Sequence, residues 1–381
     1  MRYFIIAGEQ SGDLHGSNLV RELFVADKSA EIFCWGGDLM ESAGATLLVH
    51  YRKMAFMGFI SVLNNLGAIS RNLNLCKEHI TAHKPDVVIF IDYPGFNLRM
   101  AEFAKNAGYK TFWYISPKLW AWNEGRVKKI KKFVNRMYII FPFEVEFYKK
   151  HDLIVEYFGN PLVDEIARRI SSFSSKGDIC KSLGIDDKPV IALLAGSRKH
   201  EIELILPEML KMIHHLPDYQ FVLAGVKNIP DELYTNIIGN EPVSLIKDRT
   251  YEILYVAQAA LVTSGTATLE AALHGTPQVV CYKGDFLSMI IAWIVIRVKY
   301  ISLVNLIMAS EVVRELIQYD LKENTVLTEL KAILPGGEKR EKILSDYKTL
   351  KNILGPAGAS GRIAREMVEE LRGRIGEGEK K

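Results

Sequence analysis

The chain has 381 residues, of which 49% are apolar and 24% are charged, a composition typical of globular protein and not of a disordered chain or a coiled coil. Lysine plus arginine (48) exceeds aspartate plus glutamate (45) by only three, so the charge balance requires no nucleic-acid partner. The cysteines lie far apart without a C-x-x-C pair, which favours neither a zinc site nor disulfides and fits a reduced, cytoplasmic protein. Two charge-free apolar stretches, 54–70 and 286–296, are poor candidates for a membrane-spanning helix of about 20 apolar residues.

Short apolar runs alternate with segments of helical spacing along the chain. The expected strands are 3–7, 32–35, 87–91, 111–115, 137–141 and 155–158, followed by 190–195, 220–224, 260–263 and 278–282. Two of them, 87–91 and the run 190–194, are apolar throughout, as strands buried on both faces of a parallel sheet are. The pattern predicts an α/β protein with two Rossmann-like, doubly wound domains.

A Ser-rich stretch separates the two series of strands, which marks a linker. We expect an N-terminal domain over residues 1–170, a linker over 171–187 and a C-terminal domain over 188–355. Apolar residues at helical spacing from residue 359 onward predict a helix and a frayed tail over 356–381.

The first expected strand is followed by a glycine-containing turn that opens a helix, Gly8 to Gly16. Such a turn lets a ligand approach the backbone, and a helix N-terminus favours anions. It matches neither the dinucleotide-binding nor the P-loop fingerprint. A tight turn in which Ser11 or Asp13 caps the helix explains the residues equally well.

Asp92 directly follows the buried strand 87–91. In open α/β sheets the ligand crevice lies beyond the carboxyl ends of the strands, where a partly desolvated carboxylate can act as a general base. The alternative is that Asp92 only caps a turn through its own backbone.

Two candidate anion cradles follow strands in the second half. Gly196 permits a close approach, Ser197 follows it, and the guanidinium of Arg198 can bind a diphosphate in a forked geometry. The second cradle is Ser264, Gly265 and Thr266, and Glu270 lies one turn into the helix that follows, where its carboxylate could accept two ribose hydroxyls. Each alone could be a capped helix, but the pair favours a nucleotide diphosphate. Since the chain has no Asp-x-Asp pair, we expect no metal, and Arg198 and helix N-termini would carry the charge of the diphosphate.

Two segments of the first half have the character of membrane-surface helices. One is nearly free of charge and holds Phe56, Met57, Phe59 and Leu63; the other, 126–136, places Val127, Ile130 and Val134 on one face among lysines and arginines. Such helices suit an anionic bilayer surface. The alternative for each is a helix that packs its apolar face on the core.

Taken together, these motifs resemble those of the lipid-A-disaccharide synthases, which are inverting, metal-independent glycosyltransferases of the two-domain GT-B architecture. The matching stretches are GEQSGD (8–13), MAFMG (54–58), IDYPGFN (91–97), YISPKLWAW (114–122), FPFE (141–144), GNPL (159–162), LAGSR (194–198), SGTATLE (264–270) and ISLVNL (301–306). They occur in the order of the family, although Ala195 stands where the family often has proline.

The resemblance implies a reaction: UDP-2,3-diacylglucosamine and 2,3-diacylglucosamine 1-phosphate (lipid X) give UDP and a β-1,6-linked disaccharide 1-phosphate, without a cofactor. Asp92 matches the family's proposed general base, and Glu9 and Arg198 are its expected catalytic companions. The expected UDP-binding residues are Gly196, Ser197, Arg198, Ser264, Gly265, Thr266, Glu270 and Asn305. The expected acceptor- and lipid-binding residues are Ser11, Gly12, Phe56, Met57, Phe59 and Leu63.

The same resemblance implies a protein peripherally associated with the inner face of the cytoplasmic membrane, as a monomer or homodimer, with a C-terminal helix that crosses to the first domain or to a second subunit. Two alternatives remain at this point. One is another GT-B enzyme acting on a UDP-sugar, such as a MurG-like transferase or a UDP-N-acetylglucosamine 2-epimerase. The other is a peripheral nucleotide-binding protein without catalytic activity.

Overall fold

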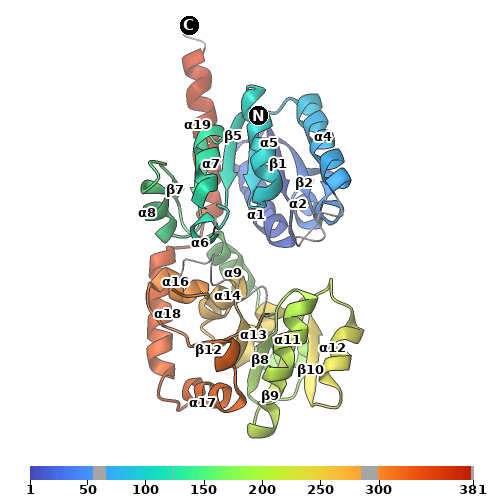
Figure 1. Ribbon diagram of the computed structural model, residues 1–381, viewed down its shortest axis with the longest axis vertical. Helices are drawn as coiled ribbons and strands as arrows, with labels where there is room; N and C mark the ends of the chain where they lie inside the picture. The colour runs from blue at the N-terminus through green and yellow to red at the C-terminus, as the bar shows by residue number, and fades with distance from the viewer. Residues whose placement is uncertain (55–65, 123, 285–298, 379–381) are drawn as a thin grey trace. The chain divides into compact units, whose positions relative to one another are not determined.

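The computed structural model describes residues 1–54, 66–122, 124–284 and 299–378. The chain forms two compact units (Figure 1), which are described separately: the first comprises Met1–Asp164 and Pro356–Lys381, and the second Glu165–Gly355. The boundary between them falls inside one helix, α9 (Pro161–Ser171).

In the first unit the strands are β1 (Arg2–Ala7), β2 (Glu31–Gly36), β3 (Thr46–His50), β4 (Val87–Ile91), β5 (Lys110–Tyr114), β6 (Arg136–Ile139) and β7 (Glu156–Tyr157). Its helices are α1 (Gln10–Ala26), α2 (Asp38–Ser42), α4 (Leu66–His83), α5 (Pro94–Asn106), α6 (Leu119–Trp122), α7 (Val127–Phe133), α8 (Phe143–Lys149) and, at the C-terminus, α19 (Ala359–Gly378).

In the second unit the strands are β8 (Val190–Leu194), β9 (Gln220–Gly225), β10 (Val243–Lys247), β11 (Ala257–Thr263), β12 (Gln278–Tyr282) and β13 (Glu315–Ile317). Its helices are α10 (Lys176–Leu183), α11 (Lys199–Leu210), α12 (Asp231–Ile238), α13 (Thr250–Val256), α14 (Thr266–His274), α16 (Leu303–Met308), α17 (Glu323–Ile333) and α18 (Arg340–Leu354).

Each unit is built on one parallel sheet, so the predicted α/β class with two doubly wound domains is confirmed. The strand order is β3-β2-β1-β4-β5-β6-β7 in the first unit and β10-β9-β8-β11-β12-β13 in the second. In each sheet, successive strands are added first on one side and then on the other. The reversal falls between the neighbouring strands β1 and β4 in the first sheet, and between β8 and β11 in the second. Ligands of open α/β sheets bind beyond the carboxyl ends of the strands at such a point.

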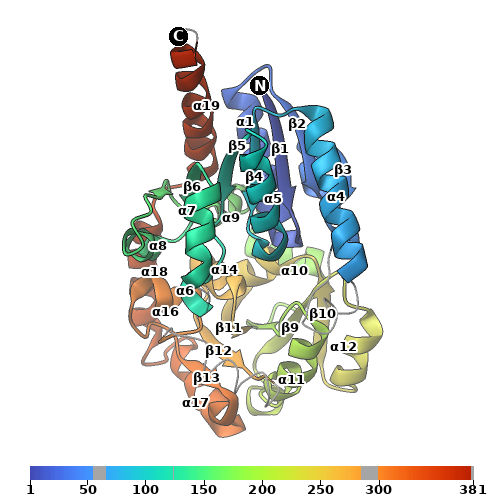
Figure 2. The same ribbon diagram turned by 45° about the horizontal axis from the view of Figure 1, so that its top comes forward.

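Strand β1 shows how the first sheet buries both faces. Its side chains alternate, and Phe4 and Ile6 join a core cluster with residues of α5 and α7, helices that lie next to one another in Figure 2. On the other face, α1 packs closely because it carries glycines: a Cβ at Gly12 would lie 3.1 Å from the Cβ of Ala7, and one at Gly16 3.2 Å from Cδ1 of Ile91.

Helix α19 belongs to the first unit although it ends the chain, and it packs against α1. Its N-terminus is capped by the carboxylate of Asp164, which accepts the backbone N–H groups of Gly358 (2.7 Å), Ala359 (3.0 Å) and Ser360 (2.8 Å). A salt bridge of 2.7 Å between Arg136 and Glu370 holds the helix further along.

The stretch that we expected to be a linker, 171–187, differs from that expectation. It contains α10, whose Ile179 and Leu183 are buried in the core of the second unit. The serines that suggested a linker lie at the end of α9 and at the start of α10, where Ser175 accepts the N–H of Asp178 as an N-cap. Serine is common at both linkers and caps, so its enrichment did not distinguish them.

Candidate active site

The carboxyl ends of β1 and β4 bring the two acidic residues of the first expected site to one edge of the sheet. Glu9 follows β1 and precedes α1, and Asp92 follows β4. The charge of Glu9 raises the pKa of Asp92, so the two carboxylates lie within electrostatic reach of each other.

Asp92 and Tyr93 both have left-handed backbone conformations, with φ of 42° and 48°. This geometry is rare for residues with a side chain, and hydrogen bonds hold it here. The Asp92 N–H donates to the carbonyl oxygen of Ile115 (3.2 Å), and the amide of buried Asn97 donates to the carbonyl oxygens of Asp92 (2.8 Å) and Ile91 (3.2 Å). The backbone therefore presents the carboxylate in a fixed position.

The environment of Asp92 suits a general base. Burial, opposed by the positive charge of Lys118 and assisted by the negative charge of Glu9, raises its pKa to about 6. A carboxylate with a pKa near neutrality is ionised at physiological pH, yet is basic enough to accept a proton in a transition state.

Tyr93 closes this edge of the sheet over Gly8. A Cβ on Gly8 would lie 2.3 Å from Cδ1 of Tyr93, so the ring sits directly against the glycine backbone. The Tyr93 hydroxyl donates to the carbonyl oxygen of Met54 (3.0 Å), the residue that precedes 55–65. The expected lipid-binding residues of that stretch, which are Phe56, Met57, Phe59 and Leu63, lie outside the described residues.

The other expected acceptor-binding residues lie in α1. Ser11 is exposed near its start, whereas Gly12 is buried against the sheet, where its lack of a side chain serves packing. The expectation that Ser11 or Asp13 caps α1 is wrong. The Asp13 carboxylate instead accepts N–H groups at the start of α2: Gly37 (2.8 Å), Leu39 (3.1 Å) and Met40 (3.1 Å). The position of Asp13 in the sequence fits a cap of α1 equally well, but its carboxylate accepts hydrogen bonds from another segment of the chain.

A second buried carboxyl belongs to Glu144, a residue of the FPFE motif to which the sequence alone gives no role. It accepts hydrogen bonds from the hydroxyl of Ser116, the indole N–H of Trp120 (3.2 Å) and the N–H of Phe141 (3.1 Å). Burial raises its pKa to about 7. Glu144 thus ties the loop after β5 to the loop after β6. The sequence signal that could have pointed to Glu144 is an acidic residue shortly after the expected strand 137–141.

In the second unit, the two expected cradles follow the adjacent strands β8 and β11. Gly196 has a φ of 113°, and the side chain of Glu201 fills the space in which its Cβ would lie. The Glu201 carboxylate accepts the N–H of Ser197 (3.1 Å) and pairs with the guanidinium of Arg198 (3.1 Å). Arg198 precedes α11 and its side chain is 65% exposed, so it is accessible to a ligand.

The second cradle is braced by the segment that carries Asn305. The Ser264 hydroxyl donates to the carbonyl oxygen of Ile301 (3.0 Å), and the N–H of Leu303 donates to the hydroxyl of Thr268 (3.2 Å). Gly265, with a φ of 137°, precedes α14, which begins at Thr266.

Glu270 is partly buried in the second turn of α14, and burial raises its pKa to about 7. The hydroxyl of Tyr251 lies 3.4 Å from its Oε1. Glu270 thus lies one turn after Thr266 in α14, and its expected contact with the ribose stays a prediction.

Asn305 is fully buried, and its amide is used within the second unit. It donates to the carbonyl oxygen of Val313 (2.8 Å) and to Glu315 (2.9 Å), and it accepts the N–H groups of Val312 (2.8 Å) and Val313 (3.0 Å). The side chain thus positions the segment beside the cradle. The sequence predicts direct contact of Asn305 with UDP, but this amide has little hydrogen-bonding capacity left for a ligand.

The basic segment 126–136 forms the short helix α7. Val127, Ile130 and Phe133 are buried in the core, and Val134 follows the helix in an extended conformation. The apolar face is therefore not available to a membrane, as the alternative interpretation predicts, whereas Lys128, Lys129, Lys131 and Lys132 are exposed.

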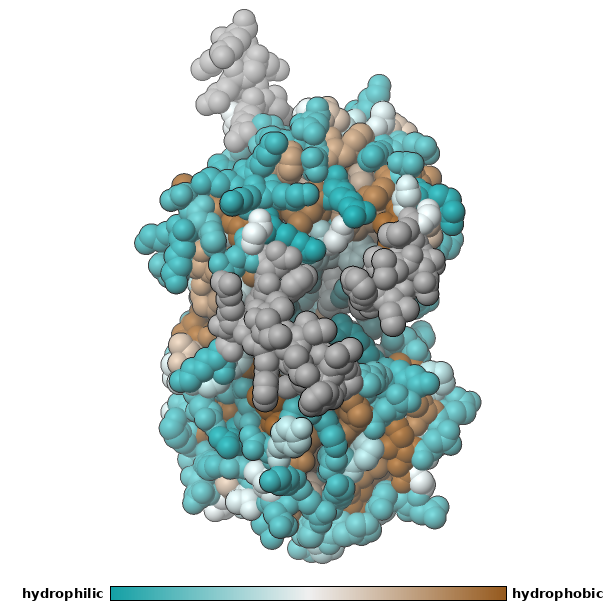
Figure 3. All heavy atoms as spheres, in the orientation of Figure 1, coloured by the Kyte–Doolittle hydropathy of each residue, from teal (hydrophilic) through white to brown (hydrophobic). Residues whose placement is uncertain are grey.

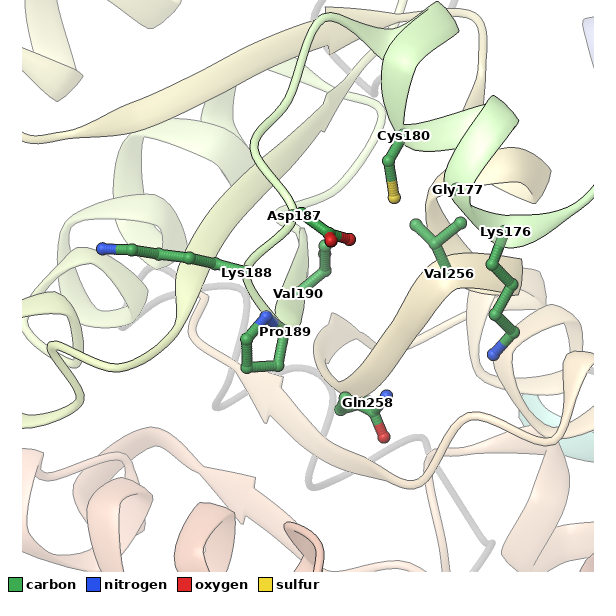
Figure 4. A pocket seen from close by; sticks show the side chains of 9 residues that line it. All are labelled: Lys176, Gly177, Cys180, Asp187, Lys188, Pro189, Val190, Val256 and Gln258. Carbon is green, nitrogen blue, oxygen red and sulfur yellow. The ribbon is translucent and has the colours of Figure 1, made fainter.

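A pocket of about 310 Å³ in the second unit lies away from both cradles. Val190 begins β8, Val256 ends α13 and Gln258 lies near the start of β11, so the pocket lies at the amino ends of these strands. Figure 4 shows Cys180 and Asp187 pointing into it. Within the described ranges, no group of three or more His, Cys, Asp or Glu residues could hold a metal ion.

Comparison with known structures supports the fold. The UDP-GlcNAc 2-epimerase from Neisseria meningitidis bound to UDP-GlcNAc has a TM-score of 0.71 at 13% identity, over 97% of this chain and 100% of that one. The S. aureus MnaA-UDP co-structure has a TM-score of 0.66 at 14% identity, over 97% of each chain. Both likenesses concern the GT-B arrangement of two Rossmann-like domains.

Comparison of sequences is more specific. The family model described as lipid-A-disaccharide synthetase matches residues 3–359. A lipid-A-disaccharide synthase from Geobacter sulfurreducens is 37% identical over 377 residues, which are 97% of each chain. Another, from Coxiella burnetii, is 35% identical over 366 residues, which are 95% of this chain and 96% of the relative. The chain belongs to the lipid-A-disaccharide synthase family.

Proposed function

We propose that this glycosyltransferase joins UDP-2,3-diacylglucosamine to 2,3-diacylglucosamine 1-phosphate, with the acceptor bound at the first unit and the UDP-sugar at the second. The family match over residues 3–359 supports the reaction. The observation that carries the division of labour is Asp92, a carboxyl with a pKa of about 6 at the end of β4, where the order of the first sheet turns back.

Asp92 accepts the proton of the acceptor 6-hydroxyl as its oxygen attacks the anomeric carbon of the donor. The new C–O bond forms on the face opposite the diphosphate while the bond to UDP breaks, so the anomeric configuration inverts. The proton ends on Asp92 and the electron pair of the broken bond leaves with UDP. Burial chiefly, and the charge of Glu9 in addition, raise the pKa of Asp92 and so strengthen it as a base.

The charge on the departing diphosphate meets Arg198 and the N–H groups at Ser264–Thr266. Both cradles follow neighbouring strands, β8 and β11, and N–H groups and a guanidinium are the donors that diphosphates bind. Glu270 is positioned for the ribose hydroxyls, one turn into α14. In this proposal Asn305 acts indirectly, by holding the segment that braces Ser264.

We further propose that the enzyme works on the inner face of the cytoplasmic membrane, where acylated substrates are found. The described residues include no helix with both the length and the apolarity needed to cross a bilayer. On the face that Figure 3 shows, hydrophilic residues cover more of the described surface than apolar ones. The exposed large apolar side chains include Leu39 in α2, Leu75 in α4 and Ile154 between α8 and β7. The four exposed lysines of α7 would favour anionic lipid by about 1 kcal/mol each.

The decisive experiment supplies purified protein with both substrates and measures the disaccharide product. Asp92→Asn should reduce kcat by about 10²–10⁴-fold, the usual contribution of a general base, with UDP affinity unchanged. Asparagine tolerates the left-handed backbone, so this variant removes the charge without straining the chain.

Asp152→Asn is the matched control, because Asp152 is also left-handed (φ 51°) but highly exposed. Full activity of Asp92→Asn would disprove the assignment of the base. If the wild-type protein binds UDP but forms no disaccharide, and instead interconverts UDP-N-acetylglucosamine epimers, the activity named for the Neisseria structure is the better alternative.

A further inference from the structure

We propose that Lys118 binds the phosphomonoester of the acceptor, and so selects a sugar 1-phosphate as the partner of Asp92. This inference rests on the proposed function, because it places the acceptor at Asp92. Lys118 lies within the motif YISPKLWAW (114–122), but no function is assigned to it above.

The sheet places Lys118 beside the base. Strands β4 and β5 are neighbours, and their last residues, Ile91 and Tyr114, are paired. The register continues one residue further, since the Asp92 N–H donates to the carbonyl oxygen of Ile115 (3.2 Å). Lys118 lies three residues beyond Ile115, and its charge acts on Asp92.

The loop that carries Lys118 is held on both sides of it. Ser116 and Trp120 both donate to the buried carboxyl of Glu144. Leu119 is 1% exposed, and the Trp120 ring packs edge-on against Phe143 with 5.0 Å between centroids. A loop fixed so firmly limits the region that the Lys118 side chain can sample.

The ammonium group itself is available for a ligand. Lys118 is exposed, and within the described part of the chain it has no hydrogen-bond or salt-bridge partner. Its charge acts on Asp92, the proposed base. An unpaired cation on an anchored loop is suited to binding an anion without a large cost in ordering.

The chemistry of the acceptor supplies that anion. In glucosamine 1-phosphate, C1 carries the phosphate and C5 carries the CH₂OH group, and both carbons flank the ring oxygen. A sugar whose 6-hydroxyl contacts Asp92 therefore has its phosphate within one ring's width of the base. Because Asp92 and Glu9 are both acidic, the phosphate needs a cation to offset their repulsion.

The test compares Lys118→Gln with wild type in detergent mixed micelles, at about pH 8. Asp92 is then ionised in both proteins, well above its pKa of about 6, so any effect of Lys118 on the base is removed. Two acceptors are used: diacylglucosamine 1-phosphate, and the same lipid with a hydroxyl in place of the phosphate.

We expect Lys118→Gln to raise KM for the phosphorylated acceptor by about 10- to 100-fold, the scale of a hydrogen bond to a charged group. The KM for the UDP-sugar and the KM for the dephosphorylated acceptor should not change, and Lys118→Arg should restore most of the affinity. Lys28→Gln is the matched control, because Lys28 is an exposed lysine of the same unit that lies between α1 and β2, at the amino end of the strand.

An equal loss with both acceptors, or no loss with either, would overturn the proposal. A second arm measures sedimentation with vesicles of phosphatidylglycerol and phosphatidylcholine. If Lys118→Gln weakens vesicle binding as much as it raises KM, the lysine binds bilayer phosphate and the proposal fails. If the wild-type protein forms no disaccharide from either acceptor, it is the proposed function that fails.

Discussion

At the scale of single residues, burial raises the pKa values of two carboxyls of the first unit into the neutral range. Asp92 reaches about 6 and Glu144 about 7. The carboxyl of Glu144 accepts hydrogen bonds from Ser116, Trp120 and Phe141, so it is engaged in holding the structure. In Asp92 the backbone makes the structural hydrogen bonds, so the carboxylate is available to accept a proton.

The pKa of Asp92 predicts the acid side of the pH profile. A general base works only when ionised, so kcat/KM should fall tenfold per pH unit below about 6 and level off above it. Lys118 opposes the upward shift, hence Lys118→Gln should move the limb to higher pH. Initial rates at saturating UDP-sugar from pH 5 to 9 measure this. A profile of the wild-type enzyme that stays level down to pH 5 would contradict it.

Arg198 is the residue whose loss should weaken UDP binding most directly. Arg198→Ala removes a charge-assisted hydrogen bond and should cost about 1.5–3 kcal/mol of binding free energy, as measured by calorimetry. Its present partner is Glu201, at 3.1 Å across one helical turn. Arg314 makes the same kind of pair with Glu311, also at 3.1 Å, so Arg314→Ala is the control. Equal UDP affinities of the two variants would refute the role of Arg198.

Sequence reasoning located residues that follow strands better than it assigned their contacts. Asp92, Gly196 and Ser264 could be placed because a short apolar run fixes where each strand ends. The roles of Asp13 and Asn305 could not be predicted, because their partners are backbone groups of other segments: 37–40 for Asp13 and 312–313 for Asn305. A side chain's tertiary partner leaves no periodicity in the sequence.

At the scale of elements, the strands that sequence reasoning missed all lie at sheet edges, although the edge strand β7 was predicted within 155–158. β3, β10 and β13 are the outer strands of their sheets, and β3 and β10 are mostly half-buried. Central strands such as β4 and β8 are buried at every position and are therefore continuously apolar. An edge strand has neither that pattern nor a clean alternation, so its sequence resembles a loop.

The contact between the turn after β1 and the turn after β4 predicts a local defect. Gly8→Ala would place a Cβ 2.3 Å from the Tyr93 ring, so the ring must move and shift the adjoining Asp92. We expect a loss of at least tenfold in kcat and a smaller effect on the melting temperature, because the Tyr93 side chain is only partly buried.

Gly95→Ala is the matched control for this variant. A Cβ at Gly95 meets nothing within 4 Å, and alanine favours the helix, α5, in which it lies. Activity should be unchanged and stability equal or slightly higher. If both alanine variants retained full kcat, the packing of Tyr93 on Gly8 would have no part in positioning the base.

At the scale of the whole molecule, the chain leaves the first unit at Asp164 and returns to it at Pro356. The strand pattern predicted two units of similar size, but a boundary within a continuous helix has no composition change to reveal it. The return of the chain is equally hidden, because the apolar spacing of α19 shows that it packs and does not show against what. Only the contacts with α1 identify its neighbour.

Asp164 joins the two ends of the first unit, so its removal should weaken that unit selectively. Asp164→Ala leaves the N–H groups of Gly358, Ala359 and Ser360 without their acceptor, and losing an N-cap costs about 1–2 kcal/mol. Thermal unfolding with and without UDP separates the units, because a ligand stabilises only the unit that binds it. We expect Asp164→Ala to lower the transition that UDP does not shift.

Asp346→Ala is the control, because it removes an exposed pair with Lys342 in the second unit. It should leave that transition unchanged. A fall confined to the UDP-sensitive transition would mean that α19 stabilises the first unit without the cap.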